Sequence, residues 1–355
     1  MIDRSTSEHL LVVMTTESTD DVTETTAAGV LTPPSSFGIE YYFQCAVLVV
    51  GIVGTAANAL ILYALIVSKQ HKKQKLIFNQ NVVDFFACLF LIVIRAFNLS
   101  KFSPSGKAGY WFCVLISSET MFWCFTLTSK ANIMLITAER YLKIVYATWS
   151  KTHLRNWMVF SAIGFAWFSG FLFTFATAFL ASDFIDGVCY SNALWASAAA
   201  YMVQVLWYIL FYYVLMLIVF IFGYWRILLV LRRQARTLAG SNSSQAQSNQ
   251  MRSNVIKTMI LVSALYAICE FLMHLFHFVL LVDASVVIPL SIYYASIFFS
   301  VFYFCANPFI YAVKFDPVKR VLRGLIFWRN PASTVHPVET TGTHTRTGTA
   351  QQAHT

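Results

Sequence analysis

Residues 286–313 read VVIPLSIYYASIFFSVFYFCANPFIYAV, an apolar run in the C-terminal part of the chain. A helix needs roughly 20 apolar residues to cross the hydrocarbon core of a bilayer, and this run is longer. Six comparable runs precede it, at about residues 43–67, 77–99, 111–142, 156–180, 196–231 and 254–282. Because only helices and closed barrels satisfy their own backbone hydrogen bonds in lipid, the sequence predicts an all-α membrane protein, a seven-transmembrane helix bundle.

The composition of the whole chain agrees with a membrane protein. Of its 355 residues, 58% are hydrophobic and 12% are charged, and the mean hydropathy is +0.63. A soluble domain carries about 25% charged residues. The net charge of +9 sits in short basic clusters between the apolar runs, unlike the interleaved basic and aromatic residues of a nucleic-acid groove. Membrane lipids are therefore expected partners and nucleic acids are not. No nucleophile with a neighbouring base and no metal-binding triad is apparent in the sequence, which argues against an enzyme.

The segments outside the apolar runs predict the remaining organisation. Residues 1–41 are rich in Thr and Ser and are predicted to be a disordered tail, followed by the helix bundle at 42–314. Residues 315–328 place Val, Leu and Ile on one helical face and Lys and Arg on the other, which predicts a short amphipathic eighth helix on the membrane surface. Residues 329–355 are polar and are predicted to be a disordered tail.

Basic residues gather in the loops on one side of the predicted bundle. They lie in the 67–77 loop, after the third run, between the fifth and sixth runs, and in the C-terminal tail. Cytoplasmic loops carry an excess of Lys and Arg. We therefore expect a multi-pass membrane protein with an extracellular N-terminus and a cytoplasmic C-terminus.

Short motifs interrupt the apolar runs at characteristic places. Glu139-Arg140-Tyr141 ends the third run, and Asn307-Pro308-Phe309-Ile310-Tyr311 ends the seventh. The other such residues are Gly54 and Asn58 in the first run, Asp84 in the second, Trp167 in the fourth, Tyr224 in the fifth and Cys269 in the sixth. In this order, over about residues 42–327, the set resembles the rhodopsin-like (class A) G-protein-coupled receptors. The stretch from Glu139 resembles invertebrate orphan and peptide-type receptors.

The resemblance implies a plasma-membrane receptor that transduces an extracellular ligand, a peptide or a small polar molecule, to heterotrimeric G proteins. The residues it implies in G-protein coupling and switching are Glu139, Arg140, Tyr141, Tyr224, Asn307, Pro308 and Tyr311. It also implies a disulfide between Cys113 and Cys189, although Cys113 lies two residues further from Arg140 than is usual in the family. Phosphorylated threonines of the C-terminal tail are expected to recruit arrestin-like regulators.

The polar residues in the middle of the bundle carry two further implications. The resemblance implies a sodium ion at Asp84 and Ser129, although Tyr303 and Phe304 stand where the family keeps small polar groups. No other cofactor is expected. Pro308 removes a backbone donor and frees a carbonyl, which Asn307 is expected to satisfy.

Four positions differ from the family pattern. Met216 occupies the position where the family has a proline in the fifth helix. Glu270 and Leu272 occupy the positions where the family has a tryptophan and a proline in the sixth helix. Because proline kinks can act as hinges, opening is expected to be stiffer or differently placed. Arg252 lies near the place where some members carry an acid that holds the arginine at the end of the third helix, so the resting state is expected to be weakly held. A receptor-like protein with constitutive or degraded signalling is therefore one alternative function.

Polar residues toward the outer ends of the predicted helices form a candidate ligand pocket. Glu270, His274 and His277 share one helical face because they are spaced at i, i+4 and i+7. The remaining expected pocket residues are Arg95, Glu119, Phe122, Tyr293 and Ile297. The alternative is that Arg95 extends to the interface and the histidines are satisfied within the bundle core. The seventh run has no Lys to hold retinal, and Phe122 stands where amine receptors carry an Asp, so neither an opsin nor a classical amine receptor is expected.

Two opposite charges fall at similar depth in the third and sixth runs. A buried Lys at mid-membrane costs about 2.5–3.5 kcal/mol on insertion scales, and an unpaired buried acid is also costly. We therefore expect an ion pair between Lys130 and Glu270, with a pair between Lys130 and Asp84 as the alternative. The same three charges, of Asp84, Lys130 and Glu270, would serve an ion transporter or channel, which is the second alternative function.

Overall fold

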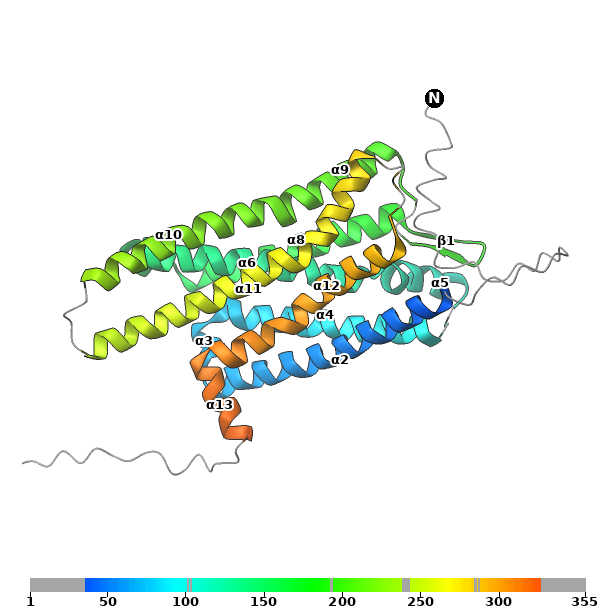
Figure 1. Cartoon of the computed structure of the whole chain (residues 1–355). Coiled ribbons are helices and arrows are strands. Elements are labelled where there is room, and N and C mark those ends of the chain that lie inside the picture. Colours follow the sequence, from blue (N-terminus) through cyan, green and yellow to red (C-terminus); the bar gives the residue numbers. More distant parts are fainter. Residues whose placement is uncertain are drawn as a thin grey trace, which may run out of the picture.

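The computed structural model describes residues 36–326, apart from 101, 103, 192–193, 238–242, 284–285 and 287. The predicted tail at 329–355 and nearly all of the tail at 1–41 lie outside the described residues. Seven stretches of the described chain are long and apolar enough to cross a membrane. The all-α fold class and the seven-helix bundle are confirmed (Figure 1).

Each span has defined bounds. The first, second, fourth, sixth and seventh spans are α2 (Ser36–Val67), α4 (Lys75–Ser100), α8 (Asn156–Ala181), α11 (Ser243–Val282) and α12 (Leu290–Lys314). The third span comprises α5 (Gly106–Phe112), the π-helical segment η1 (Cys113–Ser117) and α6 (Thr120–Val145). The fifth comprises α9 (Ala198–Ile209), the π-helical segment η2 (Leu210–Val214) and α10 (Leu215–Thr237).

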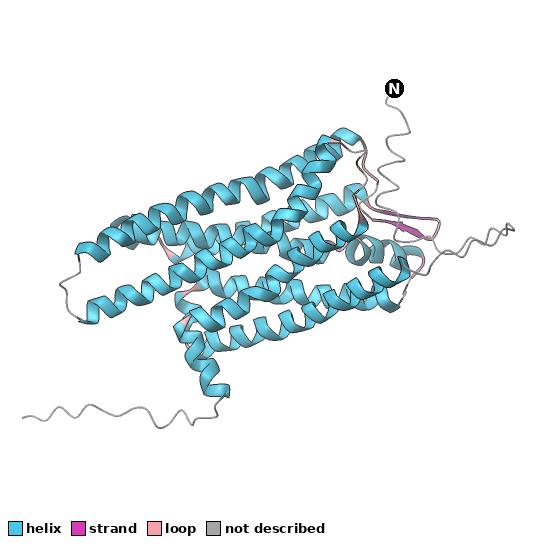
Figure 2. Cartoon of the chain, viewed as in Figure 1, coloured by secondary structure: helices cyan, strands magenta, loops and turns pink. Residues whose placement is uncertain are grey.

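Short elements connect the spans. α3 (Gln70–Lys73) and α7 (Ala147–His153) lie between the first and second and between the third and fourth spans. A hairpin of β1 (Asp183–Ile185) and β2 (Val188–Tyr190) precedes the fifth, and Figure 2 shows it at one end of an otherwise helical molecule. After α12, α13 (Asp316–Ile326) turns sharply away from the bundle (Figure 1), at the place of the predicted eighth helix.

The spans pack against one another side by side, and α6 contacts several of them. α2 packs on α4 and α12, α12 packs on α11, and α6 contacts α4, α8 and α10. Large aromatic side chains on α8, including Trp157, Phe165 and Phe168, are exposed on the outside, whereas Asp84 and Lys130 inside are fully buried. This arrangement is the one expected of a bundle surrounded by lipid, because charged groups avoid hydrocarbon and apolar groups do not.

The third span is broken near the end that carries the hairpin. Glu119 has a left-handed backbone (φ 53°), which L-residues rarely adopt. Side-chain hydroxyls donate to backbone carbonyls at this turn. Ser118 Oγ donates to the Cys113 carbonyl at 2.9 Å, and Thr120 Oγ1 donates to the Val114 carbonyl at 2.5 Å. The two extra residues between Cys113 and Arg140 are absorbed by η1 and this turn.

The fifth span contains its own irregularity without a proline. η2 lies just before Met216, and the Tyr266 hydroxyl of α11 donates to the Tyr212 carbonyl inside η2. The Tyr213 hydroxyl donates back to the Ala267 carbonyl of α11 at 3.2 Å. A π-helical turn departs from the regular α-helical hydrogen-bond pattern, and here a side chain of the neighbouring span donates to one of its carbonyls.

Candidate functional site

The end of the bundle that carries Arg140, called the Arg140 end below, has a polar lining. Arg140 donates to the Gln74 side-chain oxygen and lies 3.7 Å from Glu139 Oε2. Glu139 Oε1 pairs with Lys143 Nζ at 2.6 Å, one helical turn further along α6. Sequence reasoning did not find Gln74. It lies between the short helix α3 and the start of α4, where no sequence pattern indicated it.

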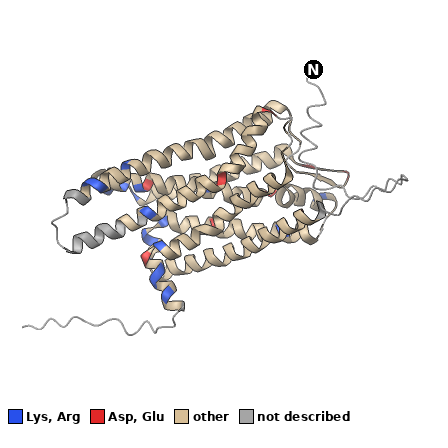
Figure 3. Cartoon of the chain, viewed as in Figure 1, with Lys and Arg blue, Asp and Glu red and all other residues tan. Residues whose placement is uncertain are grey.

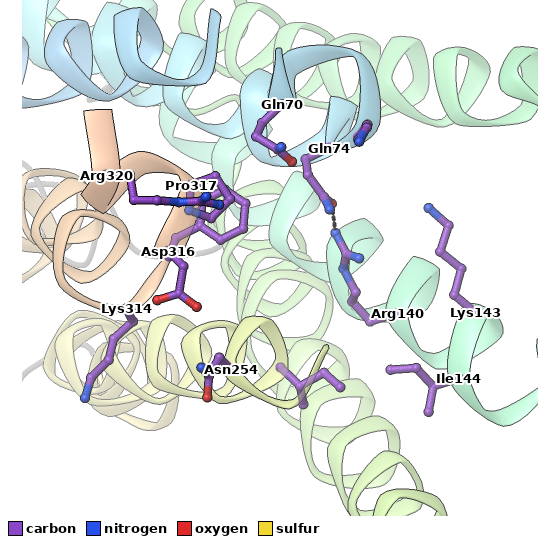
Figure 4. Close-up of a pocket in the computed structure, with 13 residues that line it drawn as sticks. Gln70, Gln74, Arg140, Lys143, Ile144, Asn254, Lys314, Asp316, Pro317 and Arg320 are labelled. Atoms are coloured by element: carbon purple, nitrogen blue, oxygen red, sulfur yellow. Dashed lines mark hydrogen bonds between the residues drawn. The ribbon is translucent and has the colours of Figure 1, made fainter. Parts of the chain in front are cut away.

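A cavity of about 350 Å³ opens beside Arg140 (Figure 4). Residues of α3, α6, α11, α12 and α13 line it, so five helices contribute to it. Its charged lining residues are Lys73, Arg140, Lys143, Lys314, Asp316 and Arg320. The cavity therefore carries five basic side chains and one acidic side chain, and it suits an anionic occupant.

The remaining motif residues at this end pack between spans, with Tyr224 and Tyr311 buried and Tyr141 partly buried. The Tyr224 hydroxyl of α10 lies 2.9 Å from Thr137 Oγ1 and 3.0 Å from Ser263 Oγ, and so joins the third, fifth and sixth spans. Tyr141 contacts the Phe222 ring. Tyr311 is 1% exposed, and its hydroxyl has no hydrogen-bond partner among the described residues.

Asp84 lies at the centre of a buried hydrogen-bond network. Its Oδ1 accepts from Ser129 Oγ at 2.6 Å and from Gln80 Nε2 at 2.9 Å, and its Oδ2 accepts from Asn307 Nδ2 at 3.1 Å. Hard cations are bound by several oxygen atoms that face one space. Amide and hydroxyl donors face the Asp84 carboxylate instead, so these residues do not fit the sodium ion that the resemblance implied.

The seventh span corrects one expectation. Pro308 has no N–H to donate to the Phe304 carbonyl one turn earlier, and Asn307 was expected to satisfy that carbonyl. Asn307 Nδ2 instead donates to Asp84, and Asn58 Nδ2 of α2 donates to the Phe304 carbonyl at 3.3 Å. The expectation was wrong because Asn307 has a buried carboxylate within reach, which is a stronger acceptor than a carbonyl.

The opposite end, called the disulfide end, is tied by Cys113 and Cys189, whose Cα atoms lie 5.4 Å apart. The bond joins β2 to η1, so the hairpin is fixed over this end of the bundle. Arg95 is 3% exposed, pairs with Glu119 and donates to Gln44 Oε1 at 3.0 Å. Arg95 therefore lies inward and does not extend to the interface. Glu119 lies in the left-handed turn between η1 and α6.

A second ion pair lies in the middle of the bundle. Lys130 Nζ lies 2.7 Å from Glu270 Oε2, both side chains are fully buried, and the Tyr208 hydroxyl accepts from the same Nζ at 3.0 Å. α6, α9 and α11 thus meet at one charge cluster. Asp84 is hydrogen-bonded to other residues, and Lys130 pairs with Glu270. The structure therefore does not form the alternative ion pair between Lys130 and Asp84. Sequence reasoning did not find Tyr208.

The sequence motifs lie on the spans in the order that the resemblance implied. The model of the family described as 7 transmembrane receptor (rhodopsin family) matches residues 57–311, more than half of the chain. This chain belongs to the rhodopsin family of receptors. No curated protein matches it significantly. Like other rhodopsin-family members, the receptor is a multi-pass protein of the plasma membrane, and this family comprises receptors rather than enzymes.

The expected pocket residues of the receptor fall into separate groups. His274 lies between the Tyr208 and Tyr213 rings, at 4.7 and 4.4 Å, and its Nδ1 is 2.8 Å from the Glu270 carbonyl. His277 Nδ1 is likewise 2.7 Å from the carbonyl of Met273.

The other three expected pocket residues lie toward the third and seventh spans. Phe122 is buried against Phe304, and Ile297 packs against the same core. Tyr293 is exposed and lies beside the Phe276 ring. Among the described residues, the receptor thus has a partly buried ion pair, Arg95–Glu119, and a fully buried one, Lys130–Glu270, with aromatic rings around the second.

Proposed function

We propose that this receptor lies with its Arg140 end in the cytoplasm and its disulfide end outside the cell. Among the described residues, only Arg95 and Lys107 are basic near the disulfide end, whereas Lys and Arg gather at the Arg140 end (Figure 3). The positive-inside rule supports this orientation. A disulfide at the outer end agrees with an oxidising compartment.

We propose further that the receptor transduces an extracellular ligand to a heterotrimeric G protein through the cavity beside Arg140. This cavity is the observation that carries the proposal. Its five basic side chains surround the end of the bundle, and a helix that ends in a carboxylate would meet favourable charge there, since a helix C-terminus is itself negative. We propose that the ligand, a peptide or a small polar molecule, binds at the disulfide end.

A measurable signal without ligand is expected. Glu270 is the only acidic residue of α11, and it is paired with Lys130, so α11 offers no carboxylate to Arg140. Arg140 is held by the neutral Gln74 and by Glu139 of its own helix. Constitutive signalling is therefore the alternative that the geometry favours most.

The experiment is ligand-free G-protein activation in cells at matched surface expression. We expect the wild-type receptor to exceed cells without it, Arg140→Ala to fall to that background, and Arg155→Ala, an exposed arginine at the same end, to keep the signal. A signal retained in Arg140→Ala would contradict the proposed coupling. Ion flux without G-protein activation would favour the transporter or channel alternative.

A further inference from the structure

Gln80 is a fully buried amide that lies one helical turn before Asp84 on α4. Its Nε2 lies 2.5 Å from Ser129 Oγ of α6 and 2.9 Å from Asp84 Oδ1. Its Oε1 accepts from Asn132 Nδ2 at 2.8 Å. The amide therefore lies between the second and third spans with its donor side toward the carboxylate.

Groups of fixed polarity set the orientation of this amide. The Leu76 carbonyl can only accept, and it receives Asn132 Nδ2 at 3.0 Å. The Trp167 indole can only donate, and it donates to Asn79 Oδ1 at 3.1 Å. Asn79 Nδ2 then faces Asn132 Oδ1 at 3.0 Å. Because Asn132 presents its donors to Gln80, the Gln80 oxygen must face Asn132 and its nitrogen must face Asp84.

We infer that the Gln80 amide takes the place of a cation beside Asp84, so that this receptor does not respond to sodium. Gln80, Ser129 and Asn307 provide donors to both carboxylate oxygens, and these donors compensate the negative charge without an ion. A cation would have to displace an amide that is itself hydrogen-bonded on its other side. Removing the Gln80 side chain frees both the space and one lone-pair direction of Asp84, and so makes a sodium site.

The test is thermal unfolding of the purified full-length receptor in NaCl and in choline chloride at equal ionic strength, which holds general screening constant. For wild type we expect the same unfolding midpoint in both salts, within about 1 °C. For Gln80→Ala and Gln80→Ser we expect sodium to raise the midpoint by at least about 3 °C in a saturable manner, as for any ligand of the native state. Adding Asp84→Asn should remove that gain.

Asn79→Ala is the matched control, because it deletes a neighbouring amide of the same network and leaves every Asp84 donor in place. It should lower the midpoint equally in both salts. A saturable sodium effect on wild type that Asp84→Asn removes would overturn the inference. So would Gln80 variants that fold but show no sodium effect. If Gln80→Ala does not fold, the measurements on Gln80→Ser and on wild type still test the inference.

Discussion

Asn58 is a single amide on which the seventh span depends. It reaches from α2 to the Phe304 carbonyl, which Pro308 leaves without its helical partner. Neutral amides of this kind are hard to assign from sequence, because several carbonyls are within reach of each. Their partners emerge only when the spans are packed.

We predict that Asn58→Ala lowers the free energy of unfolding by about 1–3 kcal/mol, the cost of leaving a buried carbonyl unpaired. Thermal unfolding of the purified receptor measures the loss. Thr55→Ala is the control, since Thr55 donates only to the Gly51 carbonyl of its own helix. Pro308→Ala returns the missing N–H, so the Asn58→Ala loss should shrink in that background. An equal loss in both backgrounds would refute the assignment.

Lys130 and Glu270 give the sharpest prediction for single side chains. Breaking one partner of a buried ion pair costs about 3–5 kcal/mol because the other charge stays buried. We expect Lys130→Met and Glu270→Gln each to lower the unfolding midpoint, and the exchange Lys130→Glu with Glu270→Lys to recover part of the loss. A double exchange no better than the worse single variant would contradict direct pairing.

The sequence predicts charged contacts better than neutral ones. Two opposite charges at similar depth in apolar spans have few acceptable partners, so the Lys130–Glu270 pair could be predicted. The contacts of Gln80 and Gln74 could not be predicted, because an amide can hydrogen-bond to many different partners. One signal was available for Gln80: it lies at i−4 from Asp84, on the same helical face.

At the scale of elements, the fifth and sixth spans are joined through η2. The missing prolines at Met216 and Leu272 suggested a stiffer or differently placed hinge, and a π-helical segment that a neighbouring span must complete was not foreseeable. The turn at Glu119 also carries a contact with another span, since Arg95 pairs with Glu119 there. Local propensity cannot report such contacts.

We predict that Tyr266→Phe destabilises the receptor by about 1–3 kcal/mol, because the Tyr212 carbonyl in η2 loses its donor. Tyr213→Phe also deletes one hydroxyl between the same spans, but Tyr213 is only partly buried, so its loss should be smaller. Unfolding midpoints of the two variants compare them directly. Equal effects would mean that the η2 carbonyl needs no partner.

At the scale of the whole molecule, the seven spans could be predicted because bilayer thickness fixes their length. The ends could not. α2 begins at Ser36 and α11 at Ser243, well before the apolar runs at 43 and 254. Helical turns beyond the hydrocarbon core contain polar residues, so hydropathy does not mark where they begin.

The proposed mechanism connects the two ends of the molecule. We propose that this arrangement is the resting one, in which the Lys130–Glu270 pair ties α11 to α6 and the Arg140 cavity stays narrow. Release of α11 would then widen the cavity for a G protein. In this proposal, Arg140 is required for the signal, whereas Glu270 restrains it.

The most direct test combines the two residues in one measurement of ligand-free G-protein activation at matched surface expression. We predict that Glu270→Gln raises the signal above wild type, that Glu40→Gln, an exposed acid of α2, leaves it unchanged, and that Glu270→Gln with Arg140→Ala falls to background. An increase in Glu270→Gln that persists without Arg140 would contradict the account.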